Sequence, residues 1–68
     1  MFDTMKKKFV RKPTGTHVHF VYNGYAWLGT VINYSNSHYD ILVDEHQIDT
    51  ITQCGGETVM RVHETKIY

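Results

Sequence analysis

Apolar and polar residues alternate with a period of two from about residue 16 onward, which predicts β-strands rather than helices. The clearest turn is Asn23-Gly24, because both residues tolerate positive φ at the centre of a type I′ hairpin turn. This turn sets Phe20 opposite Trp27 and Val18 opposite Gly29. One face of the hairpin then collects Val18, Phe20, Tyr22, Tyr25, Trp27 and Val31, and the other collects His17, His19, Val21, Ala26, Leu28, Thr30 and Ile32.

A second turn is expected at residues 35–37, where Ser, Asn and Ser follow one another. Taken as a three-residue loop, it sets Tyr34 opposite His38 and Val31 opposite Ile41. The apolar residues of the next strand then join the face of the first hairpin: Tyr39, Ile41 and Val43. Two turns chosen independently give one apolar face, which a one-residue slip would scramble.

The remaining residues are expected to supply two more strands. Residues 48–54 form the fourth and residues 58–63 the fifth, joined by a tight turn at Gly55-Gly56, with Met60 opposite Ile51. The spacing of three between Ile48 and Ile51 also fits a helical turn, so this strand has an alternative. The apolar end of the tail, Ile67 and Tyr68, is placed to close the sheet.

Five short strands in so few residues must curl to bury one face, which predicts a half-open barrel. Gly29 marks the place for a bend or bulge. With these strands the chain resembles the small SH3-like barrels, including Tudor and KOW domains. The likeness rests on residues 15–18, 27–31 and 39–43 and on a late strand ending in Val62. It implies a non-catalytic module that binds proteins, peptides or nucleic acid.

Charge is divided unevenly along the 68 residues, although seven Lys and Arg balance seven Asp and Glu. Residues 1–12 hold five basic residues and one acid, whereas residues 13–68 hold two basic residues and six acids. Pro13 blocks helix continuation between the two parts. We therefore expect a basic, extended N-terminal leader over residues 1–14 and one small all-β domain over residues 15–68.

Two groups of side chains are candidates for binding. Rings near the mouth of a barrel could grip a cation, stack a base or hold a peptide, and apolar residues on the second face could dock on a protein. The candidates for a protein or ligand site are Tyr22, Tyr25, Trp27, Tyr39, Leu28, Ile32 and Leu42. The candidates for nucleic-acid binding are the basic residues of the leader, Lys6, Lys7, Lys8, Arg11 and Lys12.

Little in the sequence points to catalysis or to a cofactor. His17 and His19 share one strand face, and His63 could join them as a third metal ligand, but solvent-facing histidines are the simpler interpretation. Cys54 is the single cysteine, so no intramolecular disulfide can form, and no phosphate loop or nucleophile elbow is present. We expect neither an enzyme nor a cofactor.

The sequence therefore predicts an interaction module that binds and modulates another protein. Small chains of this kind are often regulators or inhibitors, for example of a host protein by a bacteriophage. The alternative is a nucleic-acid binder that uses the basic leader and the aromatic residues. A homodimer through the second face is a further option. We expect no membrane partner and a cytoplasmic location, the host cytoplasm if the source is viral.

Overall fold

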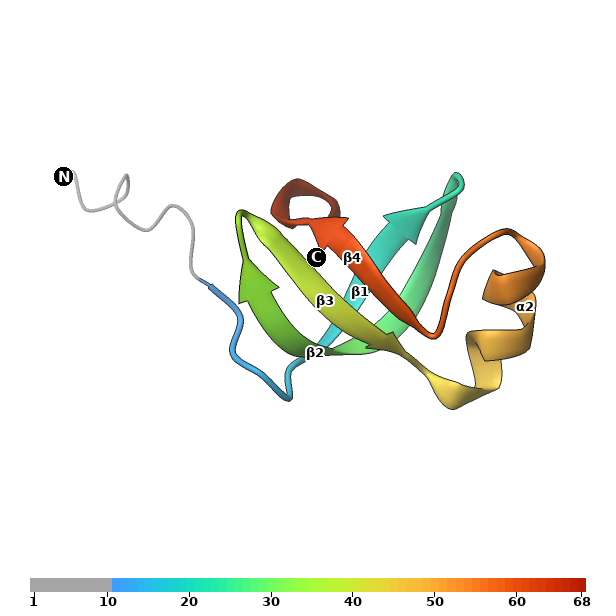
Figure 1. Ribbon diagram of the computed structural model, residues 1–68, viewed down its shortest axis with the longest axis horizontal. Coiled ribbons are helices and arrows are strands. Elements are labelled where there is room, and N and C mark those ends of the chain that lie inside the picture. The colour runs from blue at the N-terminus through green and yellow to red at the C-terminus, as the bar shows by residue number, and fades with distance from the viewer. Residues whose placement is uncertain (1–10) are drawn as a thin grey trace, which may run out of the picture.

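The computed structural model describes residues 11–68, and the basic residues Lys6, Lys7 and Lys8 lie outside them. The described residues form one antiparallel sheet in the order β1-β2-β3-β4, with a short helical segment beyond one end (Figure 1). In chain order the elements are β1 (His17–Tyr22), β2 (Tyr25–Ser35), β3 (His38–Val43), η1 (Glu45–Gln47), α2 (Ile48–Gln53), β4 (Val59–His63) and η2 (Glu64–Lys66).

The first hairpin confirms the register expected from its turn. Phe20 lies opposite Trp27, and Val18 opposite Gly29. Asn23 and Gly24 have φ values of 56° and 81°, the two positive angles that a type I′ turn requires. The sequence Asn-Gly was therefore sufficient to fix which residues of β1 and β2 face each other.

The second hairpin corrects the expected loop. Ser35 pairs with His38 and Tyr34 with Tyr39, so the turn has two residues, Asn36-Ser37, rather than three. The register then shifts between Val31 and Asn33, where Ile32 forms a bulge. The bulge restores the pairs Val31–Ile41 and Gly29–Val43, so the apolar face is the expected one although the pairing near the turn was wrong.

Replacing Ser37 with glycine should stabilise this second turn. Asn36 and Ser37 have φ values of 52° and 64°, and serine is strained there whereas glycine is not. We expect a gain of about 0.5–1 kcal/mol in the free energy of unfolding, after the entropy that glycine adds to the unfolded chain. Urea denaturation measures it. Asn36→Gly is the matched control and should gain less, because asparagine tolerates the same angles; an equal or larger gain would contradict this reasoning.

Residues 48–54 do not form the expected fourth strand. Ile48–Gln53 is the helix α2, so the alternative helical turn is the correct one. Ile51 is fully buried and Ile48 partly buried, three positions apart on one side of the helix, whereas Asp49 and Thr50 are exposed. The hydroxyl of Thr52 also donates to the carbonyl of Ile48 at 2.9 Å, a bond that suits a helix.

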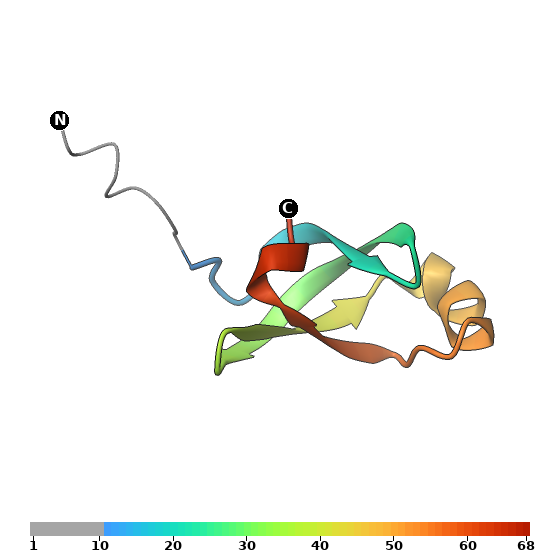
Figure 2. The same cartoon turned by 90° about the horizontal axis from the view of Figure 1, so that it is seen from above.

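The sheet consequently has four strands rather than five. β4 pairs with β3, and Met60 lies opposite Ile41 instead of opposite Ile51. The tail after η2 reaches the other edge of the sheet, where Ile67 bridges Phe20. The backbones of Tyr68 and His19 exchange two hydrogen bonds of 2.9 Å. The tail thus adds a short pairing to β1, as Figure 2 shows at the η2 end of the molecule.

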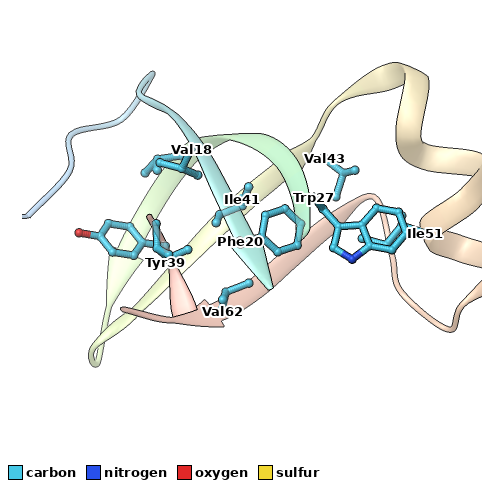
Figure 3. Packing of buried hydrophobic residues seen from close by; sticks show 10 residues of the cluster. Val18, Phe20, Trp27, Tyr39, Ile41, Val43, Ile51 and Val62 are labelled. Carbon is cyan, nitrogen blue, oxygen red and sulfur yellow. The ribbon is translucent and has the colours of Figure 1, made fainter. Parts of the chain in front are cut away.

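The core lies inside the curve of the sheet (Figure 3). Phe20 and Ile41 lie at its centre, with Trp27 and Ile51 on the side toward α2. Gly29 is buried within β2 and approaches Ile41 and Leu42 closely. No helix in residues 11–68 is long and apolar enough to cross a membrane. The buried residues are Val18, Phe20, Trp27, Val31, Tyr39, Ile41, Val43, Ile51, Val62 and Ile67.

Candidate protein-interaction site

A pocket of about 380 Å³ lies between the first hairpin and α2. Tyr25 stands beside it with 64% of its surface exposed, and its ring meets Trp27 edge-on at 6.5 Å between ring centres. The residues that line this hairpin-tip pocket are Tyr25, Ala26, Trp27, Gln47, Thr50 and Cys54. Aromatic and apolar side chains therefore form one wall, and the polar groups of η1 and α2 form the other.

The strand edge beside the pocket is open. β2 extends past the end of β3, so the backbone of Leu28 finds other partners: its N–H donates to Gln47 Oε1 at 2.7 Å, and its carbonyl accepts from the N–H of Asp44 at 3.0 Å. Alternation along a strand points the N–H and carbonyl of Ala26 to the same side. Ala26 pairs with Val21 of β1 only, and no backbone partner is found within residues 11–68 for its groups on the side of β3. A donor and an acceptor are thus exposed beside an apolar pocket.

The other aromatic candidates divide into buried residues and residues far from this pocket. Trp27 is only 5% exposed, and its indole N–H donates to the carbonyl of Tyr22 at 2.9 Å, so it forms the pocket floor. The hydroxyl of Tyr22 lies 3.4 Å from the carbonyl of Cys54, which links the hairpin to the end of α2. Tyr39 is 1% exposed and belongs to the core. The structure does not gather these rings into one cage.

A second cluster of polar and aromatic groups forms at the other end of β2. The hydroxyl of Tyr34 donates to Glu64 at 2.6 Å, and its ring lies 4.6 Å from that of Tyr39. Arg11 stacks over Tyr34, with its guanidinium carbon 4.3 Å from the ring centre. The N–H of Lys12 donates to the hydroxyl of Tyr39 at 2.8 Å. The end of the leader thus contacts the folded domain.

The pKa of Tyr34 is raised above the ordinary 10.0. The largest cause is the hydrogen bond that the phenol donates to Glu64, followed by partial burial of the phenol and by the negative charge of Glu64. The folded state holds this proton more tightly than the unfolded chain. The resulting stabilisation is complete below pH 10.0 and should be lost as the pH rises through the raised value. Urea denaturation should therefore show wild type losing its advantage over Tyr34→Phe in that alkaline range.

The matched control for this titration is Glu64→Gln, which keeps an acceptor and removes the charge. Absorbance of tyrosinate should show Tyr34 ionising at lower pH in that variant than in wild type. If the two proteins titrate identically, Glu64 is not the cause of the raised pKa.

The apolar candidates of the second face lie on the outside of the sheet. Leu42 pairs with Val59 across β3 and β4, and Ile32 projects from the bulge. These three side chains are each a little over 40% exposed, whereas Leu28 is partly buried. Beside them, the guanidinium of Arg61 bonds Asp40 and the carbonyl of Ser35 at 3.0 Å and 2.8 Å. This polar network separates the outer apolar residues from the second turn.

The metal candidates do not converge. Nδ1 of His17 lies 3.2 Å from the hydroxyl of Thr30, and Nδ1 of His63 accepts from the N–H of Thr65 at the start of η2. The ring of His63 meets that of His38 at 5.0 Å. Among the described residues no three side chains of His, Cys, Asp or Glu come together in a way that could hold a metal ion.

Several residues of these sites had no signal in the sequence. Gln47 bonds an unpaired strand edge, and Glu64 bonds Tyr34 across 30 positions of the chain. Only the final packing brings such groups together, and no spacing rule predicts them. No protein-family model matches this chain, and comparisons with curated proteins and with solved structures return no match.

Proposed function

We propose that this chain is a non-catalytic module that binds another protein, with the hairpin-tip pocket as the contact. The observation that carries the proposal is the exposed ring of Tyr25 beside an apolar pocket floored by Trp27. Tyrosine and tryptophan are enriched at the centres of protein interfaces, where they give large contact areas for few rotatable bonds. An apolar side chain of the partner would enter the pocket.

The open edge of β2 adds specificity to this contact. One residue of an extended partner segment could donate its N–H to the carbonyl of Ala26 and accept at its own carbonyl from the N–H of Ala26, as in strand addition. Because Gln47 and Asp44 already satisfy Leu28, only a short segment of edge is available. The pocket and the edge together favour a partner that presents one apolar side chain on an extended backbone.

For the fold, we propose a small SH3-like barrel. The curvature of β2 and the pairing of the tail with β1 support this proposal, because they bring the two edges of the four-stranded sheet toward each other (Figure 2). A reducing compartment suits the single cysteine, Cys54.

Photo-crosslinking tests the proposed contact directly. p-Benzoylphenylalanine placed at Tyr25 in the full chain should give a covalent adduct with one partner protein in lysate. The same residue placed at Ile32, which is 42% exposed on the outer face, is the matched control and should not give that adduct. Adducts with the same partner at both positions, or none at position 25, would contradict the proposal. A product of twice the 8.0 kDa chain mass would show a homodimer instead.

Nucleic-acid binding is the second candidate, and Arg11 is the observation that favours it. Its guanidinium and the Tyr34 ring form a stacked pair at the end of the basic leader. Proteins that bind single-stranded DNA or RNA combine basic and aromatic side chains in this way. Glu64 lies against the same ring and would repel a phosphate, which places this candidate second.

A further inference from the structure

The sheet has two edge strands, β1 and β4, which do not pair with each other in the described residues. In the described residues the tail joins β1 only at its middle, through His19 and Phe20. Beyond that point the two strands diverge toward the tip of the first hairpin (Figure 2). A pocket of about 360 Å³ lies between them, lined by residues of both edges and by Lys66 of η2. We call this opening the β1–β4 seam.

Both sides of the seam present backbone groups in hydrogen-bonding orientation. On β1, alternation points the N–H and carbonyl of Val21 away from β2, as it does for His19, whose groups bond the tail. On β4, the same rule points those of Arg61 away from β3, because Met60 and Val62 face it. In the described part of the chain Val21 pairs only with Ala26 of β2 and Arg61 only with Asp40 of β3, so no strand pairs with the outward side of either residue. Each edge therefore offers a donor and an acceptor.

The charge around the seam is opposite to that of the domain. Residues 13–68 contain six acids and only two Lys or Arg, and these two, Arg61 and Lys66, both line the seam. His38 and His63 line it as well, and none of the acids does. Asp40 pairs with Arg61, whereas Lys66 has no salt bridge among residues 11–68. Lys66 is thus the one Lys or Arg of residues 13–68 without a salt bridge, and it lies at the β1–β4 seam.

We propose that the β1–β4 seam binds an extended, acidic peptide segment of a partner protein. The segment adds a strand to the sheet, and its carboxylates lie near Lys66 and the histidines. A peptide supplies both donors and acceptors to Val21 and Arg61, whereas a nucleic-acid backbone supplies phosphate acceptors only. This inference rests on the proposed role as a protein-interaction module and adds a second surface with a different chemistry.

A synthetic peptide of alternating Val and Glu tests the proposal by titration into the ¹⁵N-labelled full chain. The amide resonances of Val21 and Arg61 should shift, and those of Tyr25 and Ala26 should not. A peptide with Lys in place of Glu should bind at least about tenfold more weakly, because like charges then meet in the seam. A peptide N-methylated at alternate residues keeps its charge and should also lose binding, because it cannot form the ladder.

The variant Lys66→Glu should weaken binding of the Glu peptide by about tenfold, whereas Lys12→Glu, with the same change of net charge outside the seam, should not. Equal effects of both variants, or undiminished binding of the N-methylated peptide, would overturn the proposal. So would an oligothymidylate that shifts the same amides as strongly as the peptide. Crosslinking at position 25 is independent of this titration. A negative result for peptide binding at the seam is therefore distinguishable from a negative result for the proposed protein-binding function.

Discussion

Gly29→Ala is expected to lower the free energy of unfolding by about 2–3 kcal/mol, the upper part of the range for an overpacked core. A Cβ at this position would lie 2.7 Å from the carbonyl oxygen of Leu42 and closer still to the side chain of Ile41. The first contact is with backbone, which a change of side-chain rotamer cannot relieve. β3 would have to move away from β2 in the middle of the sheet.

Urea denaturation of the full chain measures this loss, with Gly24→Ala as the comparison. Gly24 has open space around it, but its φ of 81° makes any side chain strained, at a cost of roughly 1–2 kcal/mol. Gly29 is not in that region, so its cost arises from packing alone. Because Gly24 lies at an exposed tip, its variant should leave the core intact. A Gly29→Ala protein within about 0.5 kcal/mol of wild type would disprove the close approach of β2 and β3.

Phe20→Ala should cost more, about 3–5 kcal/mol, because it removes a fully buried ring from the centre of the core. Domains are stabilised by roughly 0.05–0.15 kcal/mol per residue, so a chain of 68 residues has little stability in reserve. We therefore expect this variant to be largely unfolded at 25 °C. Circular dichroism and thermal unfolding measure the effect.

Tyr25→Ala is the matched control for Phe20→Ala. Strict alternation assigns both residues to the same face of the hairpin, but Tyr25 is 64% exposed at the tip whereas Phe20 has no exposed surface. The control should change stability by less than about 1 kcal/mol while removing the proposed partner contact. Similar losses of stability in the two variants would show that Tyr25 has a structural role, and the interaction site would have to lie elsewhere.

The sequence predicted the first hairpin correctly because Asn-Gly is a strong local signal. The second turn was misjudged, since Asn36-Ser37 is a weaker form of the same two-positive-φ turn. The error did not change the core, because the bulge at Ile32 compensates for the shorter loop. Alternation thus fixed which residues are buried more reliably than it fixed their partners near the turn.

The region after β3 shows the limit of pattern reasoning. Six residues are too few to separate a helix from a strand, and only the burial of Ile51 against the core decides in favour of α2. The seam could not be predicted either, because its existence depends on β4 pairing with β3 rather than with residues 48–54. The tail was expected to close the sheet, but it only pairs with the edge strand β1, where Ile67 is buried and Tyr68 stays exposed.

The candidate site was partly visible in the sequence. The exposure of Tyr25 followed from its place beside the turn, but the same alternation put Trp27 and Tyr39 among the binding candidates, and both are core residues. Aromatic residues serve the core and the surface equally well, so residue type alone does not separate the two roles. Burial, which depends on α2 and the second hairpin, separates them.

The central claim is that the folded domain, rather than the basic leader, contacts the partner. The most direct measurement is capture of partners by the full chain and by a variant with Lys6→Gln, Lys7→Gln and Lys8→Gln, each with and without nuclease. We predict that both proteins capture the same partner, that nuclease leaves the amount unchanged, and that Tyr25→Ala abolishes it. Loss of capture in the leader variant or after nuclease, with Tyr25→Ala unaffected, would contradict the claim and favour nucleic-acid binding.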